Sequence, residues 1–383
     1  MDETREEMIV VEHEPNQEAV ISELPVTSVV PLEFRGTAGE YFKIWIVNLC
    51  LSIATLGIYS AWAKVRTKRY FYGNTFLNGV SFDYDADPVK ILKGRIIIGI
   101  LFGALAISQH ISLTVYGVMI GVFFLIFPWF AVRALAFNAR YSSYRNVRFD
   151  FKGRLSEAYK VFVALPLAIP FTLGLIYPYL KKHQVDFFMN SHRYGVRPFK
   201  FDADTKAFWP IYGAAWAMSI GLAVVFGIFI TVIIAGLSAS GGLLANIGDA
   251  GPDTFAADSL LFASIWVIYG IMYLAMLFIA AYIKANVTNI MWNNTRLGQH
   301  GFESRQTGSG LYKIYLTNLF AVVFTAGLAM PWAMIRLAKY KADCLTVWIL
   351  GDLDVKASKT QQEIGAAGDA ALDLGDFDFD LGL

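Results

Sequence analysis

Apolar residues along the chain gather in long blocks, which are separated by short basic and aromatic segments. No Lys or Arg occurs between Arg95 and Arg133, or between Lys206 and Lys284. Each of these gaps is long enough for two membrane-spanning helices of about 20 residues and a turn. The pattern therefore predicts four spanning helices, near residues 95–111, 113–135, 207–237 and 258–283.

Three shorter apolar units are also about long enough to span, at residues 44–63, 161–180 and 314–335. If all three crossed, the chain would have seven spans, and one strongly basic loop would lie outside the cytoplasm, against the positive-inside bias. Each unit instead has basic residues at both ends and an internal glycine, namely Gly57, Gly174 or Gly327. We therefore favour three broken or re-entrant units, with seven spanning helices as the alternative.

Composition supports a membrane location. The 383 residues are 56% hydrophobic and only 16% charged, with a mean hydropathy of +0.48, which is too apolar for an ordinary soluble domain. In the four-span arrangement every Lys and Arg lies on the cytoplasmic side, and both termini are cytoplasmic. The acidic ends, residues 1–40 and 356–383, are interpreted as flexible tails.

One motif recurs along the chain. YFKIWIVNL at residues 41–49 returns as LYKIYLTNL at 311–319, and a third copy begins near residue 158. Partial copies follow the two long apolar gaps. The pattern predicts an all-α polytopic membrane protein with internal repeats and short cytoplasmic strands. We divide its membrane domain, 41–355, into units near 41–93, 94–157, 158–206, 207–310 and 311–355.

Aromatic and basic residues share one helix face after each apolar unit, because they are spaced four residues apart. Such a face anchors a helix at the membrane surface, and arginines there can bind anionic headgroups. The candidate lipid- or interface-binding residues are Trp62, Arg66, Tyr70, Trp129, Arg133, Trp332, Arg336 and Tyr340. Asn48 and Asn318 occupy equivalent positions and are the candidates for lining a solute path.

The segment TLGIYSAWAKVRTKRYFYGNT at 55–75, the Gly-x-x-Phe that follows it and ILKGR at 91–95 resemble the YjgN-like family of bacterial inner-membrane proteins. The similarity covers roughly residues 32–355. The resemblance implies a multi-pass protein of the bacterial inner membrane. It carries no catalytic residue, substrate or cofactor.

No catalytic motif, phosphate loop or metal-ligand spacing is present, and His183 and His192 are assigned to the basic flank. We therefore expect no enzyme activity, no cofactor, no metal and no nucleic-acid partner, and name membrane lipids, anionic ones included, as the partners. The first functional hypothesis is a channel or facilitator-type transporter for a small solute, because broken membrane units form transporter sites. The alternative is a non-enzymatic lipid-binding or interaction scaffold on the cytoplasmic face.

Overall fold

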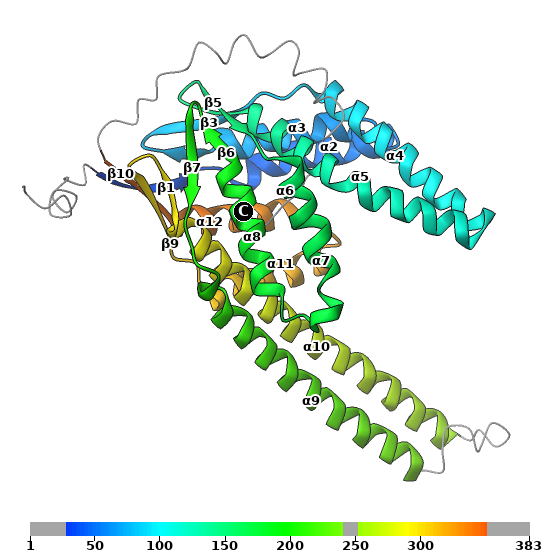
Figure 1. Cartoon of the computed structure of the whole chain (residues 1–383). Helices are drawn as coiled ribbons and strands as arrows, with labels where there is room; N and C mark the ends of the chain where they lie inside the picture. The colour runs from blue at the N-terminus through cyan, green and yellow to red at the C-terminus, as the bar shows by residue number, and fades with distance from the viewer. Residues whose placement is uncertain (1–27, 240–251, 351–383) are drawn as a thin grey trace, which may run out of the picture.

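The computed structural model describes residues 28–239 and 252–350, and combines long helices with a small barrel of short strands (Figure 1). The helices are α2 (Ala38–Ala54), α3 (Ser60–Gly73), α4 (Pro88–Ile111), α5 (Leu113–Arg140), α6 (Leu155–Tyr159), α7 (Leu165–Leu167), α8 (Tyr177–Ser191), α9 (Trp209–Ala239), α10 (Pro252–Asn293), α11 (Gly308–Phe324) and α12 (Met330–Asp343). Short helical turns lie at Lys160–Ala164, Pro170–Thr172 and Thr205–Ala207. The tail predicted for 356–383, residues 1–27 of the predicted N-terminal tail and the loop 240–251 between α9 and α10 lie outside the described residues.

Ten antiparallel strands close into a barrel in the order β1-β10-β9-β8-β7-β6-β5-β4-β3-β2. They are β1 (Ser28–Phe34), β2 (Thr75–Leu77), β3 (Val80–Tyr84), β4 (Ser142–Tyr144), β5 (Val147–Phe151), β6 (His192–Tyr194), β7 (Arg197–Phe201), β8 (Thr295–Leu297), β9 (His300–Ser304) and β10 (Leu345–Ile349). Tight hairpins join β2 to β3, β4 to β5, β6 to β7 and β8 to β9, whereas β1 and β10, the first and last described strands, pair with each other. The residues Ser28–Phe34, which the sequence analysis assigned to the N-terminal tail 1–40, therefore complete the barrel.

The closed barrel shows that the prediction of an all-α protein is wrong. Most of its strands have only three or five residues, which is too short for alternation to stand out beside helices of 14 to 42 residues. The short strands were foreseen, but their closure was not. The backbone N–H and C=O groups at the edge of each hairpin pair with a strand that is distant in the sequence. Local sequence patterns do not show such pairing.

A constant register relates the hairpins to one another. Phe82 lies opposite Tyr144, Phe149 opposite Tyr194 and Phe199 opposite Leu297. Side chains alternate between the two faces of a strand. With this register, the side chains at equivalent positions of successive hairpins therefore lie on the same face, at the same level of the barrel.

The helices α3, α5, α8 and α10 each run directly into the first strand of a hairpin, and α12 runs directly into β10. The first strand residue often closes the helix end. The hydroxyls of Thr75, Ser142 and Thr295 donate to the carbonyl four residues earlier, at distances of 2.8, 2.8 and 2.5 Å. These bonds satisfy carbonyls that a helix end leaves without a backbone partner. The helices therefore fix where each strand pair begins.

Four of the described helices are long and apolar enough to cross a membrane, at Pro88–Ile111, Leu113–Arg140, Thr205–Ala235 and Ala263–Asn293. They confirm the four apolar helices expected from the two gaps in basic residues. The α4–α5 pair and the α9–α10 pair extend from the barrel region in clearly different directions (Figure 1). They therefore do not form one bundle around a shared axis.

The three shorter apolar units are broken, as the sequence indicates. Gly57, Gly174 and Gly327 have φ angles of +91°, +83° and +93°, and each follows a residue that is also left-handed. Leu56 before Gly57, for example, has a φ of 51°. None of the three units is a continuous helix. The seven-span alternative needs a continuous spanning helix at each of these positions, and the structure does not contain one there.

Replacing Gly57 by Ala is expected to lower the free energy of unfolding by about 1–2 kcal/mol, because a side chain is strained in the left-handed region. The added methyl group would meet no atom within 4 Å, so crowding does not contribute. Gly39, in the first turn of α2, is the matched control, since its methyl group would also meet nothing. Thermal unfolding of the solubilised chain compares Gly57→Ala with Gly39→Ala. Equal midpoints would contradict a strained turn at Gly57.

Candidate functional site

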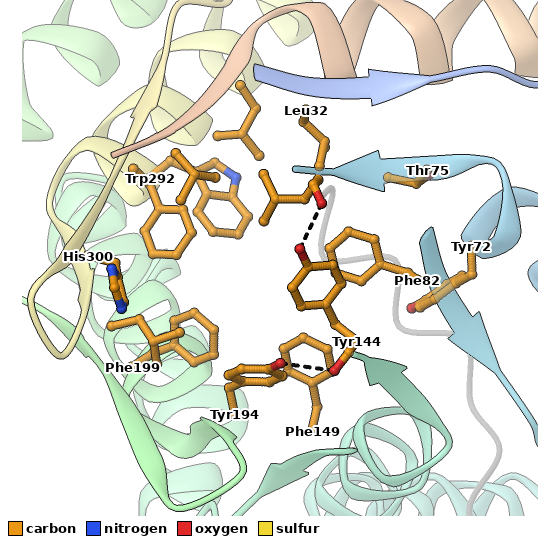
Figure 2. A pocket seen from close by; sticks show the side chains of 15 residues that line it. Leu32, Tyr72, Thr75, Phe82, Tyr144, Phe149, Tyr194, Phe199, Trp292 and His300 are labelled. Atoms are coloured by element: carbon orange, nitrogen blue, oxygen red, sulfur yellow. Dashed lines mark hydrogen bonds between the residues drawn. The ribbon is translucent and has the colours of Figure 1, made fainter. Parts of the chain in front are cut away.

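The inside of the barrel holds a cavity of about 290 Å³ whose wall is almost wholly apolar. Two rings of side chains, contributed by all five strand pairs, form most of this wall. One ring comprises Leu77, Tyr144, Tyr194, Leu297 and Val347, and the other Leu32, Phe82, Phe149, Phe199 and Phe302. In Figure 2 these side chains point from the surrounding strands into an open centre. The barrel is therefore lined but not filled.

The two tyrosines of these rings do not offer their hydroxyls to the cavity. Tyr144 Oη donates to the carbonyl of Leu77 at 2.7 Å, and Tyr194 Oη donates to the carbonyl of Tyr144 at 2.9 Å (Figure 2). Their rings pack against phenylalanines, with centroids 4.8 Å apart for Phe82–Tyr144 and 5.1 Å for Phe149–Tyr194. Since a buried hydroxyl that is already bonded presents little polarity, the cavity wall behaves as an aromatic surface.

His300 contributes an imidazole to this wall, and it is 2% exposed. Its Nδ1 accepts from the backbone N–H of Leu350 at 3.3 Å, and its Nε2 lies 3.4 Å from Arg197 Nη1. Burial, and secondly the charge of Arg197, lower the pKa of His300. The imidazole is therefore neutral at physiological pH and adds no charge to the cavity wall.

A second cavity of about 510 Å³ adjoins the first, since Tyr72, Phe82, Phe149, Phe199 and Trp292 line both. It lies where the helix ends meet the strands. We call it the chamber. The polar residues that line it, apart from Tyr72 and Trp292, are Lys68, Asn138, Ser142 and His192. The barrel cavity is therefore the apolar end of the combined space, and the chamber is the end that contains polar groups.

Lys68, from α3, supplies the positive charge of the chamber. Its Nζ lies 2.7 Å from Asn138 Oδ1 and 5.2 Å from the centre of the Tyr84 ring. None of the described residues that line the chamber is acidic. The ammonium group therefore places a positive charge in this wall, and a positive charge favours the binding of an anion.

His192 contributes a neutral polar group to the chamber. Its Nδ1 donates to the carbonyl of Phe188 at 2.7 Å, and burial lowers its pKa to about 4. The sequence analysis counted His192 with the basic flank, and that assignment is wrong. A histidine packed between Phe151 and Phe188 loses the hydration that its charged form needs.

The candidate lipid-binding residues line neither cavity. The arginines and tryptophans pair locally, since the guanidinium of Arg133 lies 5.5 Å from the Trp129 ring and that of Arg336 lies 5.2 Å from the Trp332 ring. Arg66 Nη1 donates to Tyr59 Oη at 3.1 Å, and Tyr59 in turn stacks on Trp62. The role of these residues at lipid headgroups stays a prediction.

Tyr70 and Tyr340 have matching structural contacts. Tyr70 Oη accepts from the backbone N–H of Thr37 at 2.9 Å, and Tyr340 Oη accepts from that of Thr307, also at 2.9 Å. Thr37 is the N-cap of α2, and Thr307 is the N-cap of α11. Tyr70 therefore fixes the start of α2, and Tyr340 fixes the start of α11.

Asn48 and Asn318 bridge the two arms of their broken units. Asn48 Nδ2 donates to the carbonyl of Ala63 at 3.4 Å, and Asn318 Nδ2 donates to that of Ala333 at 3.2 Å. Neither lines the barrel cavity or the chamber. The contacts explain why the same residue recurs at this position without requiring a solute path.

Sequence reasoning did not find Lys68, Asn138 or the aromatic rings of the barrel as site residues. One signal was present, because Phe82 and Phe149 recur at equivalent positions after a helix end. Lys68 follows Arg66 by two residues and so points to another face of the helix. Only the closure of the barrel shows that this other face borders a cavity.

The four apolar helices and the closed barrel define a multi-pass membrane protein with an enclosed apolar cavity. The family model described as "Bacterial protein of unknown function (DUF898)" matches residues 29–374, and the chain belongs to this family.

Three relatives support the family resemblance noted from the sequence. Inner membrane protein YjgN of Salmonella typhimurium (strain LT2) is 26% identical over 367 residues, which cover 84% of this chain and 89% of that protein. The YjgN proteins of Escherichia coli K12 and O157:H7 are 30% identical over 159 residues, or 41% of this chain and 40% of theirs. No solved structure gives a significant match. With its four apolar helices, the chain is an integral inner-membrane protein.

Proposed function

We propose that this protein is a non-enzymatic binding protein of the inner membrane, and that its barrel and chamber hold a small anionic amphiphile, such as a fatty acid. The observation that carries the proposal is the change of chemistry along the two adjoining cavities. Aromatic and aliphatic side chains enclose the apolar end, and Lys68 supplies a positive charge at the other. Both volumes are of the size that small-molecule sites use, about 300–1,000 Å³.

An amphiphile matches this gradient better than a small polar solute does. A hydrated polar solute would lose water in the barrel without finding a hydrogen-bond partner there, which is unfavourable. Burial of a hydrocarbon chain against the phenylalanine side chains of the cavity wall would be favourable, because it removes apolar surface from water. A carboxylate near Lys68 would gain a charge-assisted hydrogen bond.

The channel or facilitator hypothesis is not favoured by the arrangement of the spans. The α4–α5 and α9–α10 pairs diverge, so one chain does not surround a transmembrane path with these four helices (Figure 1). Solute flux into vesicles that contain the purified protein would favour transport over binding.

Lys68→Met is expected to weaken decanoate binding about tenfold or more, because it removes a hydrogen bond to a charged group. Binding of decanol, which has the same chain but no charge, should change little. Lys339→Met, on an exposed position of α12, is the matched control and should bind both probes as the parent does. Titration of each variant in nanodiscs measures the two affinities. An unchanged decanoate affinity in Lys68→Met would refute the proposed role of the chamber.

The orientation proposed from the basic residues places the barrel and both termini in the cytoplasm. A reporter that is active only outside the cytoplasm should give no signal when inserted at Gly195, in the turn between β6 and β7. The same reporter inserted at residue 248, between the last two apolar helices, should give a strong signal. A strong signal at Gly195 would reverse the proposed orientation.

A further inference from the structure

A third cavity, separate from the barrel and the chamber, lies between α8, α9 and α10 and has a volume of about 460 Å³. None of its lining residues borders the other two cavities. Half of its lining residues are aliphatic, and all three helices also contribute polar or aromatic residues. Those that matter for its chemistry are Tyr177, Lys181, Tyr212, Trp216, Lys284 and Thr288. We call this cavity the α8–α10 cleft.

The cleft carries two positive charges and no negative one among its described lining residues. Lys181 comes from α8, and Lys284 comes from the last part of α10. Burial lowers the pKa of Lys181, since the charged ammonium loses hydration in this wall. A bound anion would restore a favourable environment to that charge.

The position of the cleft connects it with the membrane. It lies beside the beginning of the span Thr205–Ala235 and near the end of the span Ala263–Asn293. Trp209 and Trp216 lie there with ring centroids 6.1 Å apart, as expected of aromatic residues at the headgroup level. Beyond the cleft, α9 exposes Ile220, Val224 and Ile228, each by more than half of its surface. An apolar track therefore continues from the charged cleft along the spanning helix.

We propose that the α8–α10 cleft binds the phosphate group of an anionic phospholipid, whose acyl chains lie along the exposed apolar face of α9. Two lysines match one phosphate, and the hydroxyls of Tyr177 and Thr288 can donate to its oxygens. Basic pockets between spanning helices bind such headgroups in other membrane proteins. A free phosphate ion shares the headgroup's charge but gains nothing from the apolar track, so the lipid is the occupant that fits both features.

The test uses the full chain in nanodiscs of phosphatidylcholine with and without phosphatidylglycerol. Native mass spectrometry counts the phosphatidylglycerol molecules that the protein retains. The variant Lys181→Gln/Lys284→Gln is expected to retain phosphatidylglycerol about 30-fold less than the parent, given the effect of each lysine near a lipid headgroup. The matched control, Lys313→Gln/Lys339→Gln, removes two lysines of α11 and α12 that lie outside the cleft and should retain the lipid as the parent does.

Three further measurements distinguish a specific headgroup site in the cleft from nonspecific retention of lipid. Lys181→Arg/Lys284→Arg should restore retention, and the parent should prefer phosphatidylglycerol to phosphatidylcholine even if the glutamine variant does not fold. Decanoate binding should be unaffected by Lys181→Gln/Lys284→Gln, because the barrel and the chamber share no residue with the cleft. The proposal is overturned if the parent shows no preference, if the glutamine variant retains phosphatidylglycerol fully, or if millimolar inorganic phosphate displaces the lipid.

Discussion

Replacing Leu77 by aspartate is expected to unfold the barrel. Leu77 is 8% exposed, lies opposite Leu32 of β1 and belongs to the apolar cluster inside the barrel. A carboxylate there would be buried among apolar side chains without a partner, which costs about 3–5 kcal/mol. A loss of that size is a large fraction of the stability of a typical domain. We therefore expect a sharply lower thermal midpoint, or a loss of folded protein from the membrane.

Val80→Asp is the matched control for this change. Val80 lies directly opposite Leu77 in the β2–β3 hairpin, but it is 36% exposed. Its carboxylate would remain hydrated, so the thermal midpoint should fall little. If both variants were equally stable, Leu77 would not be part of a closed apolar interior, and the barrel would be refuted.

Filling the barrel cavity is expected to abolish binding while the fold is kept. Val347 lines the cavity from β10 and is 4% exposed. In Val347→Trp the indole would occupy the space that the proposed ligand needs, so decanoate and decanol should both bind at least about tenfold more weakly. The unfolding free energy should stay within about 2 kcal/mol of the parent value, because the new ring enters empty space.

The neighbouring variant Thr346→Trp provides the control, because successive strand residues point to opposite faces and Thr346 faces away from the cavity. It should bind both probes as the parent does. The two tryptophan variants also differ from Lys68→Met, which is expected to spare decanol. Normal decanol binding by Val347→Trp would show that the hydrocarbon chain does not enter the barrel.

The apolar helices could be predicted from the sequence because their signal is local. The absence of Lys and Arg between Arg95 and Arg133 marks α4 and α5, and the positive φ at Gly57 occurs where the apolar unit contains its glycine. Span length and glycine geometry each depend on a few neighbouring residues, and both are readable without tertiary information.

The barrel and its cavity could not be predicted in this way. The pairing of β1 with β10 joins Ser28 to Ile349, and the cavity needs all five strand pairs at once. Tyr70 and Tyr340, which sequence reasoning named as candidate interface residues, also bond to Thr37 and Thr307 through their hydroxyls, and these contacts could not be predicted from the sequence. An aromatic residue one turn after an arginine is compatible with both a structural contact and a place at the membrane surface, so the role of these tyrosines at the interface stays a prediction.

Photolabelling with a decanoate analogue that carries a diazirine at the end of its chain tests the central claim most directly. If the hydrocarbon lies in the barrel, labelled peptides from the full chain in nanodiscs will include β5, β7 and β9, whose Phe149, Phe199 and Phe302 form the wall. Val347→Trp should remove this labelling, and Thr346→Trp should keep it. Label confined to the exposed apolar faces of α4, α5, α9 and α10 would contradict the proposal, because it would place the amphiphile in the bilayer and leave the barrel without the proposed ligand.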